Sequence, residues 1–146
     1  MRIILDTSSL AAVLDEKDAW HKKAVLIEQK LIALGHETLF LDCVVNEVIN
    51  VLMRRLRERK RAGEFNGLLK RLQAYVPEEN ISWTYRSIEQ NYSSILETIR
   101  KSRCTLNLHD ALIVSVANEF EIKHIVSFDK DFDNVGMKRI KEAGDL

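Results

Sequence analysis

The sequence predicts a single α/β domain over residues 1–146, with a central parallel sheet of about four to five strands flanked by helices. Three observations favour this fold class. Short apolar runs alternate with longer segments of helical period, as in strands joined by helical crossovers. The length suits one domain with a sizeable core. One proline and five glycines are too few for the many tight turns of an all-β fold.

The first expected strand is the apolar run 2–5, which contains two isoleucines and ends at Asp6. The hydroxyl residues at 7–9 can cap a helix, because their side chains accept hydrogen bonds from free N–H groups. We therefore expect a short helix over residues 10–14, which breaks in the polar segment 15–18.

A second helix is expected over residues 20–34, where apolar residues recur every three or four positions. Gly35 is placed to cap its C-terminus. The apolar run 38–41 predicts a second buried strand, and the helical period resumes over residues 44–61. The alternation of strand and helix that favours a parallel sheet thus continues through this part of the chain.

The second half of the chain keeps the same alternation. Gly63 and Gly67 are expected to interrupt or end the preceding helix. Further helices are expected over residues 65–72, 89–101 and 108–120. Further strands are expected over residues 81–83 and 124–128, with a last short one between 135 and 146. The helix over 89–101 has an apolar face that consists of Tyr92, Ile95, Leu96 and Ile99.

The composition is that of a globular protein, with 46% hydrophobic and 30% charged residues. No apolar run approaches the roughly 18–20 residues needed to span a bilayer, and the N-terminus has no signal-peptide pattern. Cys43 and Cys104 are too few for a disulfide framework. We therefore expect a cytoplasmic protein that does not engage a membrane.

The net charge is zero, with 22 basic and 22 acidic residues, but the basic residues are unevenly placed. Residues 54–61, RRLRERKR, carry six basic side chains and one acid, and they are called the basic segment below. The rest of the chain is correspondingly acidic. A local basic stripe on an acidic body is typical of proteins that contact a polyanion, although a solvated helix face has the same composition.

Four acidic residues lie at positions that local structural roles do not easily explain when the four are taken together. Asp6 and Asp129 each follow an expected strand, Glu47 flanks an apolar helical stripe, and Asp110 lies on an apolar helix face. Each has a local alternative. Asp110 can form a capping box with Asn107, Glu47 can favour a helix N-terminus, and Asp6 and Asp129 can cap turns or helices. Because parallel sheets bind ligands at the carboxyl ends of their strands, we expect the four acids to meet there.

Converging carboxylates are the ligands that Mg²⁺ and Mn²⁺ prefer. One or two such ions can activate water and stabilise the leaving oxygen of a phosphodiester. The sequence has no G-x-S-x-G elbow, no phosphate-binding glycine loop, and no HExxH or Cys/His zinc spacing. A haloacid-type phosphatase needs a second Asp where this chain has Ser8, and the acidic pair and late lysine of a response-regulator receiver are not clear either.

Three segments together resemble the PIN domain, a nuclease fold, and within it the small prokaryotic group typified by VapC toxins. They are IILDTSSLAAVLD, DCVVNEVINVLMRR and LNLHDALIVSVANEFEIKHIVSFDKDFD. The family has a first strand ending in Asp, a Glu on the helix after the second strand, a late Asp-Ala helix, and a strand ending in T/S-x-D/N. The ordered set covers essentially the whole chain, so the resemblance implies a PIN-like domain over residues 1–146.

Carried over residue by residue, the resemblance assigns Asp6, Glu47 and Asp110 as the three main metal-site acids and Asp129 as the fourth. All four are therefore expected to be catalytic and to bind Mg²⁺ or Mn²⁺. Supporting positions are Ser8, Ser127 and, as the second candidate to Asp129 among the late acids, Asp131.

The resemblance implies a metal-dependent endoribonuclease, commonly dimeric, that serves as the toxin of a toxin–antitoxin pair. Its partners would be an RNA substrate, an antitoxin protein and a second copy of the chain. The basic segment would then guide RNA phosphates toward the acids through Arg54, Arg55, Arg57 and Lys60. Two alternatives on the same fold are an RNA-processing nuclease without an antitoxin and a catalytically silent module that binds RNA or protein.

Overall fold

The computed structural model describes residues 1–146 as one α/β domain built on a single parallel sheet. The sheet has the strand order β3-β2-β1-β4-β5. Its strands are β1 (Arg2–Leu5), β2 (Glu37–Leu41), β3 (Ile81–Ser82), β4 (His124–Val126) and β5 (Lys138–Ile140). The helices are α1 (Thr7–Leu14), α2 (His21–Ala33), α3 (Asp42–Glu58), α4 (Phe65–Tyr75), α5 (Tyr85–Lys101) and α6 (Leu108–Glu119). The predicted fold class is confirmed, with the higher of the two strand numbers.

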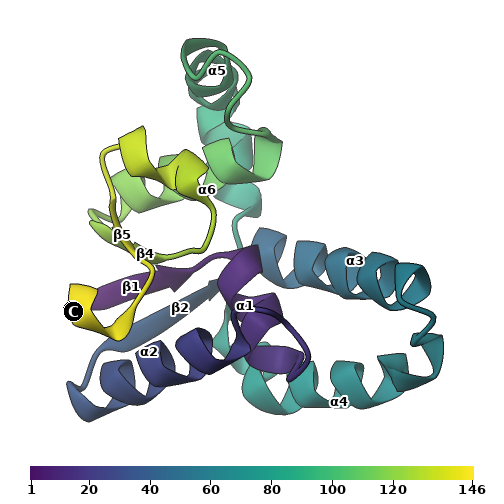
Figure 1. Ribbon diagram of the computed structural model, residues 1–146. Coiled ribbons are helices and arrows are strands. Elements are labelled where there is room, and N and C mark those ends of the chain that lie inside the picture. The colour runs from purple at the N-terminus through teal and green to yellow at the C-terminus, as the bar shows by residue number, and fades with distance from the viewer.

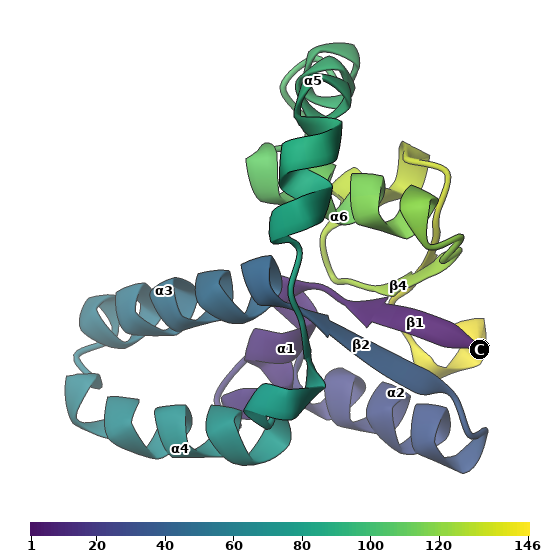
Figure 2. The same cartoon turned by 180° about the vertical axis from the view of Figure 1, so that it is seen from behind.

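Helices cover both sides of this sheet (Figure 1). The helices α1 and α2 lie on one side, and α6 lies on the other side with α5 packed against it. The helix α3 leaves the carboxyl end of β2 and runs outward, and α4 returns beside it, as Figure 2 shows from behind. No helix is both long enough and apolar enough to cross a membrane.

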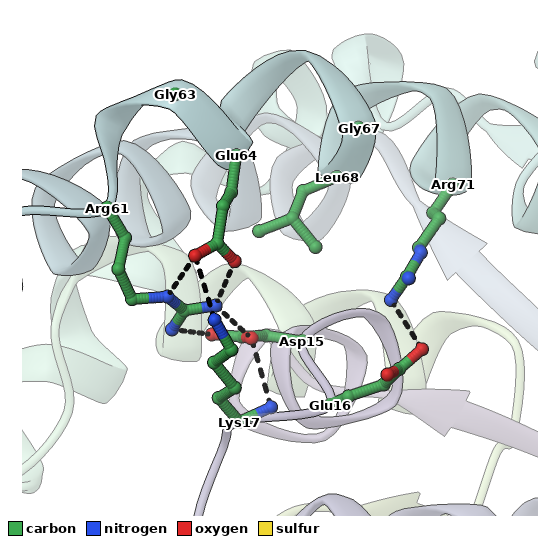
Figure 3. Close-up of a pocket in the computed structure, with 9 residues that line it drawn as sticks. All are labelled: Asp15, Glu16, Lys17, Arg61, Gly63, Glu64, Gly67, Leu68 and Arg71. Atoms are coloured by element: carbon green, nitrogen blue, oxygen red, sulfur yellow. Dashed lines mark hydrogen bonds and ion pairs between the residues drawn. The ribbon is translucent and has the colours of Figure 1, made fainter.

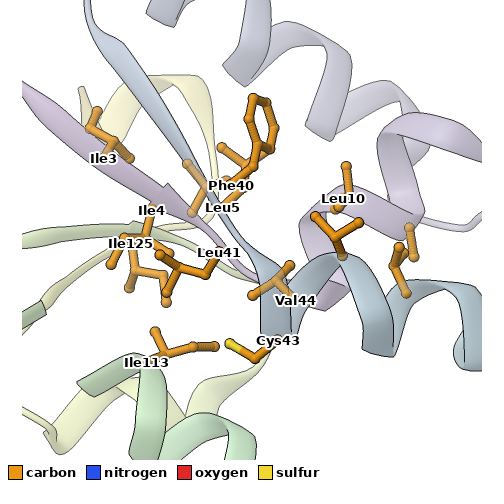
Figure 4. Close-up of a cluster of buried hydrophobic side chains, with 14 of the residues drawn as sticks. Ile3, Ile4, Leu5, Leu10, Phe40, Leu41, Cys43, Val44, Ile113 and Ile125 are labelled. Carbon is orange, nitrogen blue, oxygen red and sulfur yellow. The ribbon is translucent and has the colours of Figure 1, made fainter. Parts of the chain in front are cut away.

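The central strand β1 sets the position of the other strands. Ile4 lies opposite Leu39 of β2 on one side and opposite Ile125 of β4 on the other. Figure 4 shows the side chain of Ile4 on the side of α6, near Ile113, while Leu5 points to the opposite side. Because successive strand residues alternate between two covered faces, a central strand must be apolar at every buried position.

Three helices begin earlier than the sequence pattern predicts, and α3 does so by two residues, at Asp42. The helix α1 begins at Thr7 and not at residue 10, because Asp6 and not one of the hydroxyl residues is its N-cap and accepts the Ser8 N–H at 3.2 Å. The helix α5 begins at Tyr85, four residues before the predicted start. Gly67 lies inside α4, so it does not end a helix. The Gly35 cap of α2 is confirmed, with φ of +64°.

The predicted apolar face of α5 is only partly buried. Ile95 is buried, whereas Tyr92 and Leu96 are 54% and 46% exposed. The helix packs against α6 and otherwise projects away from the sheet (Figure 1). The apolar face that the sequence predicts is therefore only partly covered in the folded protein.

Candidate active site

Asp6 lies at the carboxyl end of β1 and is almost completely buried. Its Oδ2 accepts hydrogen bonds from the Ser8 N–H at 3.2 Å, the Ser8 hydroxyl at 2.7 Å and the Ser127 hydroxyl at 2.8 Å. Burial raises the pKa of Asp6, and the hydrogen bonds from the two serines oppose this shift. All three bonds end on Oδ2, so Oδ1 remains available as a ligand. The expected supporting positions Ser8 and Ser127 thus both contact Asp6.

Glu47 lies in the second turn of α3 and connects two of the predicted site segments. Its Oε2 accepts a hydrogen bond from the Thr7 hydroxyl at 3.0 Å, beside Asp6. The same oxygen lies 3.7 Å from Nδ1 of His109, beside Asp110. Thr7 and His109 are site neighbours that the sequence patterns did not predict. Their only sequence signal is that each adjoins one of the four acids.

Asp110 lies near the start of α6 and satisfies both interpretations of its sequence position. It forms the capping box, because its Oδ2 accepts the Asn107 N–H at 3.1 Å while Asn107 Oδ1 accepts the Asp110 N–H at 3.0 Å. Burial, followed by the charges of Asp6, Glu47 and Asp129, raises the pKa of Asp110 to about 6. The capping role therefore does not remove Asp110 from the neighbourhood of the other acids.

The late acids divide into different environments. The Asp129 N–H donates to the Ser127 hydroxyl at 2.9 Å, and the Asp129 charge contributes to the raised pKa of Asp110. Asp129 Oδ1 also accepts the Asp131 N–H at 2.9 Å, which starts a short 3₁₀ turn over Lys130–Asn134. Asp131 is half-buried on this turn, whereas Asp129 is exposed. We call Asp6, Glu47, Asp110 and Asp129 the acid cluster.

The acid cluster does not form a closed metal cage. No three His, Cys, Asp or Glu side chains are close enough together to hold an ion directly in this arrangement. The donor set nevertheless fits Mg²⁺ or Mn²⁺, because it contains only hard carboxylate oxygens whose mutual repulsion a cation would relieve. Mg²⁺ usually keeps several waters and takes one or two carboxylates directly.

The basic segment lies on the outer part of α3, away from the acid cluster (Figure 1). At about 1.5 Å per residue, Arg54 is roughly 10 Å and Arg57 roughly 15 Å along the helix from Glu47, and Lys60 follows the end of the helix at Glu58. Arg54, Arg57 and Lys60 are exposed, and no acid of the protein forms an ion pair with them. Arg55 differs, because its guanidinium pairs with the buried carboxylate of Asp18.

Arg61, the last residue of the basic segment, is also bound within the protein (Figure 3). Its guanidinium donates two hydrogen bonds to Asp15, at 2.9 and 3.1 Å, and two to Glu64, at 2.7 and 3.0 Å. Lys17 also reaches Glu64, at 2.8 Å. This group of charges ties the segment after α1 to the α3–α4 connection. The basic segment therefore combines free and structural cations.

Comparisons with known proteins agree with this architecture. A family model of the PIN domain matches residues 3–138, a range that contains the whole acid cluster. Among solved structures, the Mycobacterium tuberculosis toxin VapC20, described as Sarcin-Ricin loop cleaving, matches with a TM-score of 0.65. The match covers 92% of this chain and 95% of that chain at 21% identity, a level at which the likeness concerns the fold. No curated protein matches the sequence significantly.

Proposed function

We propose, from the premise that this chain belongs to the PIN domain family, that it is an endoribonuclease dependent on Mg²⁺ or Mn²⁺. One observation carries the proposal. Four carboxylates from distant parts of the chain gather at the carboxyl end of the sheet, where burial and the charges of the other three raise the pKa of Asp110. Two of the four, Asp6 and Asp110, are buried, and a protein has little reason to bury like charges close together unless they bind a cation. PIN domains are a nuclease family, so the reaction that a bound cation would assist is the cleavage of a phosphodiester bond.

Within this proposal each acid has a role. Asp6 and Asp110 are the most buried of the four and would hold the ion directly, while Glu47 and Asp129 would bind it through water. A bound divalent ion supplies a nucleophilic water and stabilises the leaving oxygen. Ser8 and Ser127 fix the Asp6 carboxylate, and Thr7 fixes Glu47. Arg54, Arg57 and Lys60 would bind phosphates of the RNA strand on the side of the cleaved bond toward the outer end of α3.

The finer part of the proposal is a toxin role. VapC20, which shares the fold, is described as a toxin that cleaves an RNA loop. We propose that this chain likewise acts in the cytoplasm on RNA of its own cell, restrained by an antitoxin. A cationic side chain of the antitoxin, most simply an arginine, would pair with the acid cluster. Co-expression with the protein encoded next to it should then restore growth and give a stable complex.

We also propose that the protein is a homodimer. The outward face of α5 and the start of α6 expose Tyr92, Leu96 and Leu108, which are 46–54% exposed. Apolar side chains gathered on a projecting helix pair favour burial against another copy. Light scattering of the purified protein would measure its mass in solution.

Cleavage assays on matched variants test the nuclease proposal. We expect the wild-type protein to cut single-stranded RNA with Mg²⁺ or Mn²⁺ and to lose this activity in EDTA. Asp6→Asn and Glu47→Gln should each abolish cleavage, and Asp129→Ala should reduce it more than Asp131→Ala. Glu58→Gln is the control, because Glu58 lies exposed on the same helix as Glu47. Wild-type rates in a folded Asp6→Asn protein would refute the assignment of the site.

A further inference from the structure

Two aromatic side chains stack on each other beside the acid cluster. Trp20 precedes α2, and Phe128 follows β4. Their ring centroids are 5.1 Å apart, and the rings are inclined by only 10°. Trp20 remains 45% exposed, although indole surface is among the most favourable to bury. The pair is therefore a flat aromatic surface that the fold leaves open to solvent.

The aromatic pair begins at the edge of the acid cluster. Phe128 stands between Ser127 and Asp129 in the chain, and its N–H donates to the Ser8 hydroxyl at 2.9 Å. The same hydroxyl donates to Asp6 at 2.7 Å. A group that rests on this pair would consequently lie next to any phosphodiester bound at Asp6 and Asp129.

The backbone that carries the exposed indole is held on both sides. The backbone N–H of Trp20 donates to Asp18 Oδ1 at 2.8 Å, and Asp18 in turn pairs with Arg55 of α3. The next residue, His21, contacts the Ala12 carbonyl of α1 through Nδ1 at 2.8 Å. Because the backbone is anchored and the ring stacks on Phe128, the indole loses little further freedom when a ligand stacks on it.

The charge around the indole suits a nucleic acid. The Lys23 ammonium lies over the Trp20 ring, 5.2 Å from its centroid, and no acid of the protein pairs with it. Because this lysine is exposed, a base that stacks on the ring can displace its side chain toward a backbone phosphate. Proteins bind single-stranded RNA by stacking its bases on aromatic side chains and contacting its phosphates with Lys or Arg. A base needs a flat apolar partner and a nearby cation, and both are present here.

We propose that Trp20, stacked on Phe128, is a platform for a base of single-stranded RNA adjacent to the bond that the acid cluster cleaves. Lys23 contacts a backbone phosphate of the same strand. This inference rests on the proposed ribonuclease function. It adds that a base next to the cleaved bond positions the RNA strand by stacking on Trp20. It also gives Arg55 a positioning role, through Asp18, in place of direct contact with RNA.

The first test uses tryptophan fluorescence in a protein that cannot cut RNA. The chain has two tryptophans, so Asp6→Asn combined with Trp83→Phe leaves Trp20 as the only indole. We expect a short single-stranded RNA of mixed sequence to quench this emission. An abasic ribose–phosphate strand of the same length should bind more weakly and quench little. Equal quenching by both strands, or none by either, would overturn the platform.

The second test compares binding of the mixed-sequence RNA to variants in the Asp6→Asn background. Trp20→Ala should weaken binding by about 5- to 150-fold, the range found for one stacked base. Trp20→Phe keeps an aromatic ring and should retain most of the affinity. Retained affinity in this variant would show that a substitution at position 20 leaves the fold intact. Trp83→Ala is the matched control, because Trp83 is 55% exposed elsewhere on the surface.

These results are separable from those that test the nuclease itself. A wild-type protein that cuts RNA while Trp20→Ala binds and cuts equally well refutes the platform and leaves the nuclease proposal intact. A protein that never cuts RNA refutes the nuclease proposal, whatever Trp20 does. If Trp20→Ala binds RNA normally but no longer binds the co-expressed neighbouring protein, the aromatic pair belongs to a protein interface, and the inference is wrong.

Discussion

Asp110 accepts the Asn107 N–H through one carboxylate oxygen while the charges of three other acids act on it. Local capping and membership of a cluster are therefore compatible, since a carboxylate has two oxygens and several lone pairs. Asp6 also has several structural contacts through a single oxygen. Its Oδ2 caps α1 and accepts hydrogen bonds from the hydroxyls of Ser8 and Ser127. An acidic residue whose sequence position predicts a capping role can thus also belong to a functional site.

The burial of the Asp110 carboxylate, together with the charges of the neighbouring acids, predicts a gain in stability on neutralisation. In the metal-free protein near neutral pH, Asp110→Asn should raise the free energy of unfolding by on the order of 1–2 kcal/mol, because the amide oxygen still caps α6 but carries no charge. Asp110→Ala loses the cap as well and should gain about 1 kcal/mol less. Urea unfolding in EDTA measures both variants. A clear destabilisation by Asp110→Asn would show that the buried charge of Asp110 does not destabilise the metal-free protein.

Among the elements, local signals located most helices and strands, and long-range contacts account for the errors. The early start of α5 coincides with Thr84, whose N–H and hydroxyl both bind Asp42 Oδ1, at 3.1 and 2.6 Å. That contact spans 42 residues and leaves no pattern in the sequence near Thr84. Similarly, Asp6 Oδ2 is bound by Ser127, 121 residues away. The family resemblance predicted Ser8 and Ser127 beside the acids, but the contact of Thr7 with Glu47 has no such signal in the sequence.

The free cations of the basic segment predict a salt-dependent interaction with RNA. Arg57→Ala combined with Lys60→Ala should weaken RNA binding and reduce the log–log salt slope by about 0.7 for each phosphate that the variant no longer binds. Lys123→Ala with Lys138→Ala removes the same charge at the amino ends of β4 and β5, and it should leave the slope unchanged. Binding isotherms across a salt series measure the effect. Equal slopes in the two double variants would assign Arg57 and Lys60 to solvent.

The bound cation of the same segment predicts acid sensitivity. Burial acts to raise the pKa of Asp15, but the Arg61 hydrogen bonds and nearby charges outweigh it, so this pKa lies below its usual value. A lowered folded-state pKa gives stability that is present above about pH 4 and is lost as the pH falls through the folded value. Arg61→Ala should cost about 2–3 kcal/mol near neutral pH and flatten the acid-side decline.

The neighbouring pair of Arg71 and Glu16 provides a control for this pH experiment (Figure 3). Both side chains are more than half exposed, so Arg71→Ala should cost less than about 1 kcal/mol and keep the wild-type pH profile. Urea midpoints from neutral pH down to about pH 3 compare the two variants. If both arginine variants lose the same small amount, the contact of Arg61 with Asp15 is only a surface ion pair.

At the scale of the whole molecule, the strand order places the ends of the chain together. The strands β1 and β4 pair although they lie near opposite ends of the sequence, and that pairing brings Ser127 and Asp129 to Asp6. Glu47 and Asp110 arrive on two further crossovers. The acid cluster exists only when the entire domain is folded, so a ligand of the cluster binds the native state and not the unfolded chain.

This coupling predicts that the metal stabilises the whole domain. An Mn²⁺ concentration about 100-fold above its dissociation constant should add about 2.7 kcal/mol, which raises the midpoint of thermal unfolding by roughly 5–10 °C. Glu58→Gln should respond in the same way, whereas Asp6→Asn and Asp110→Asn should respond little. The order of stability should therefore reverse: Asp110→Asn exceeds the wild type in EDTA and falls to or below it in saturating Mn²⁺. Equal Mn²⁺ shifts in the wild type and both site variants would place the ion away from the acid cluster.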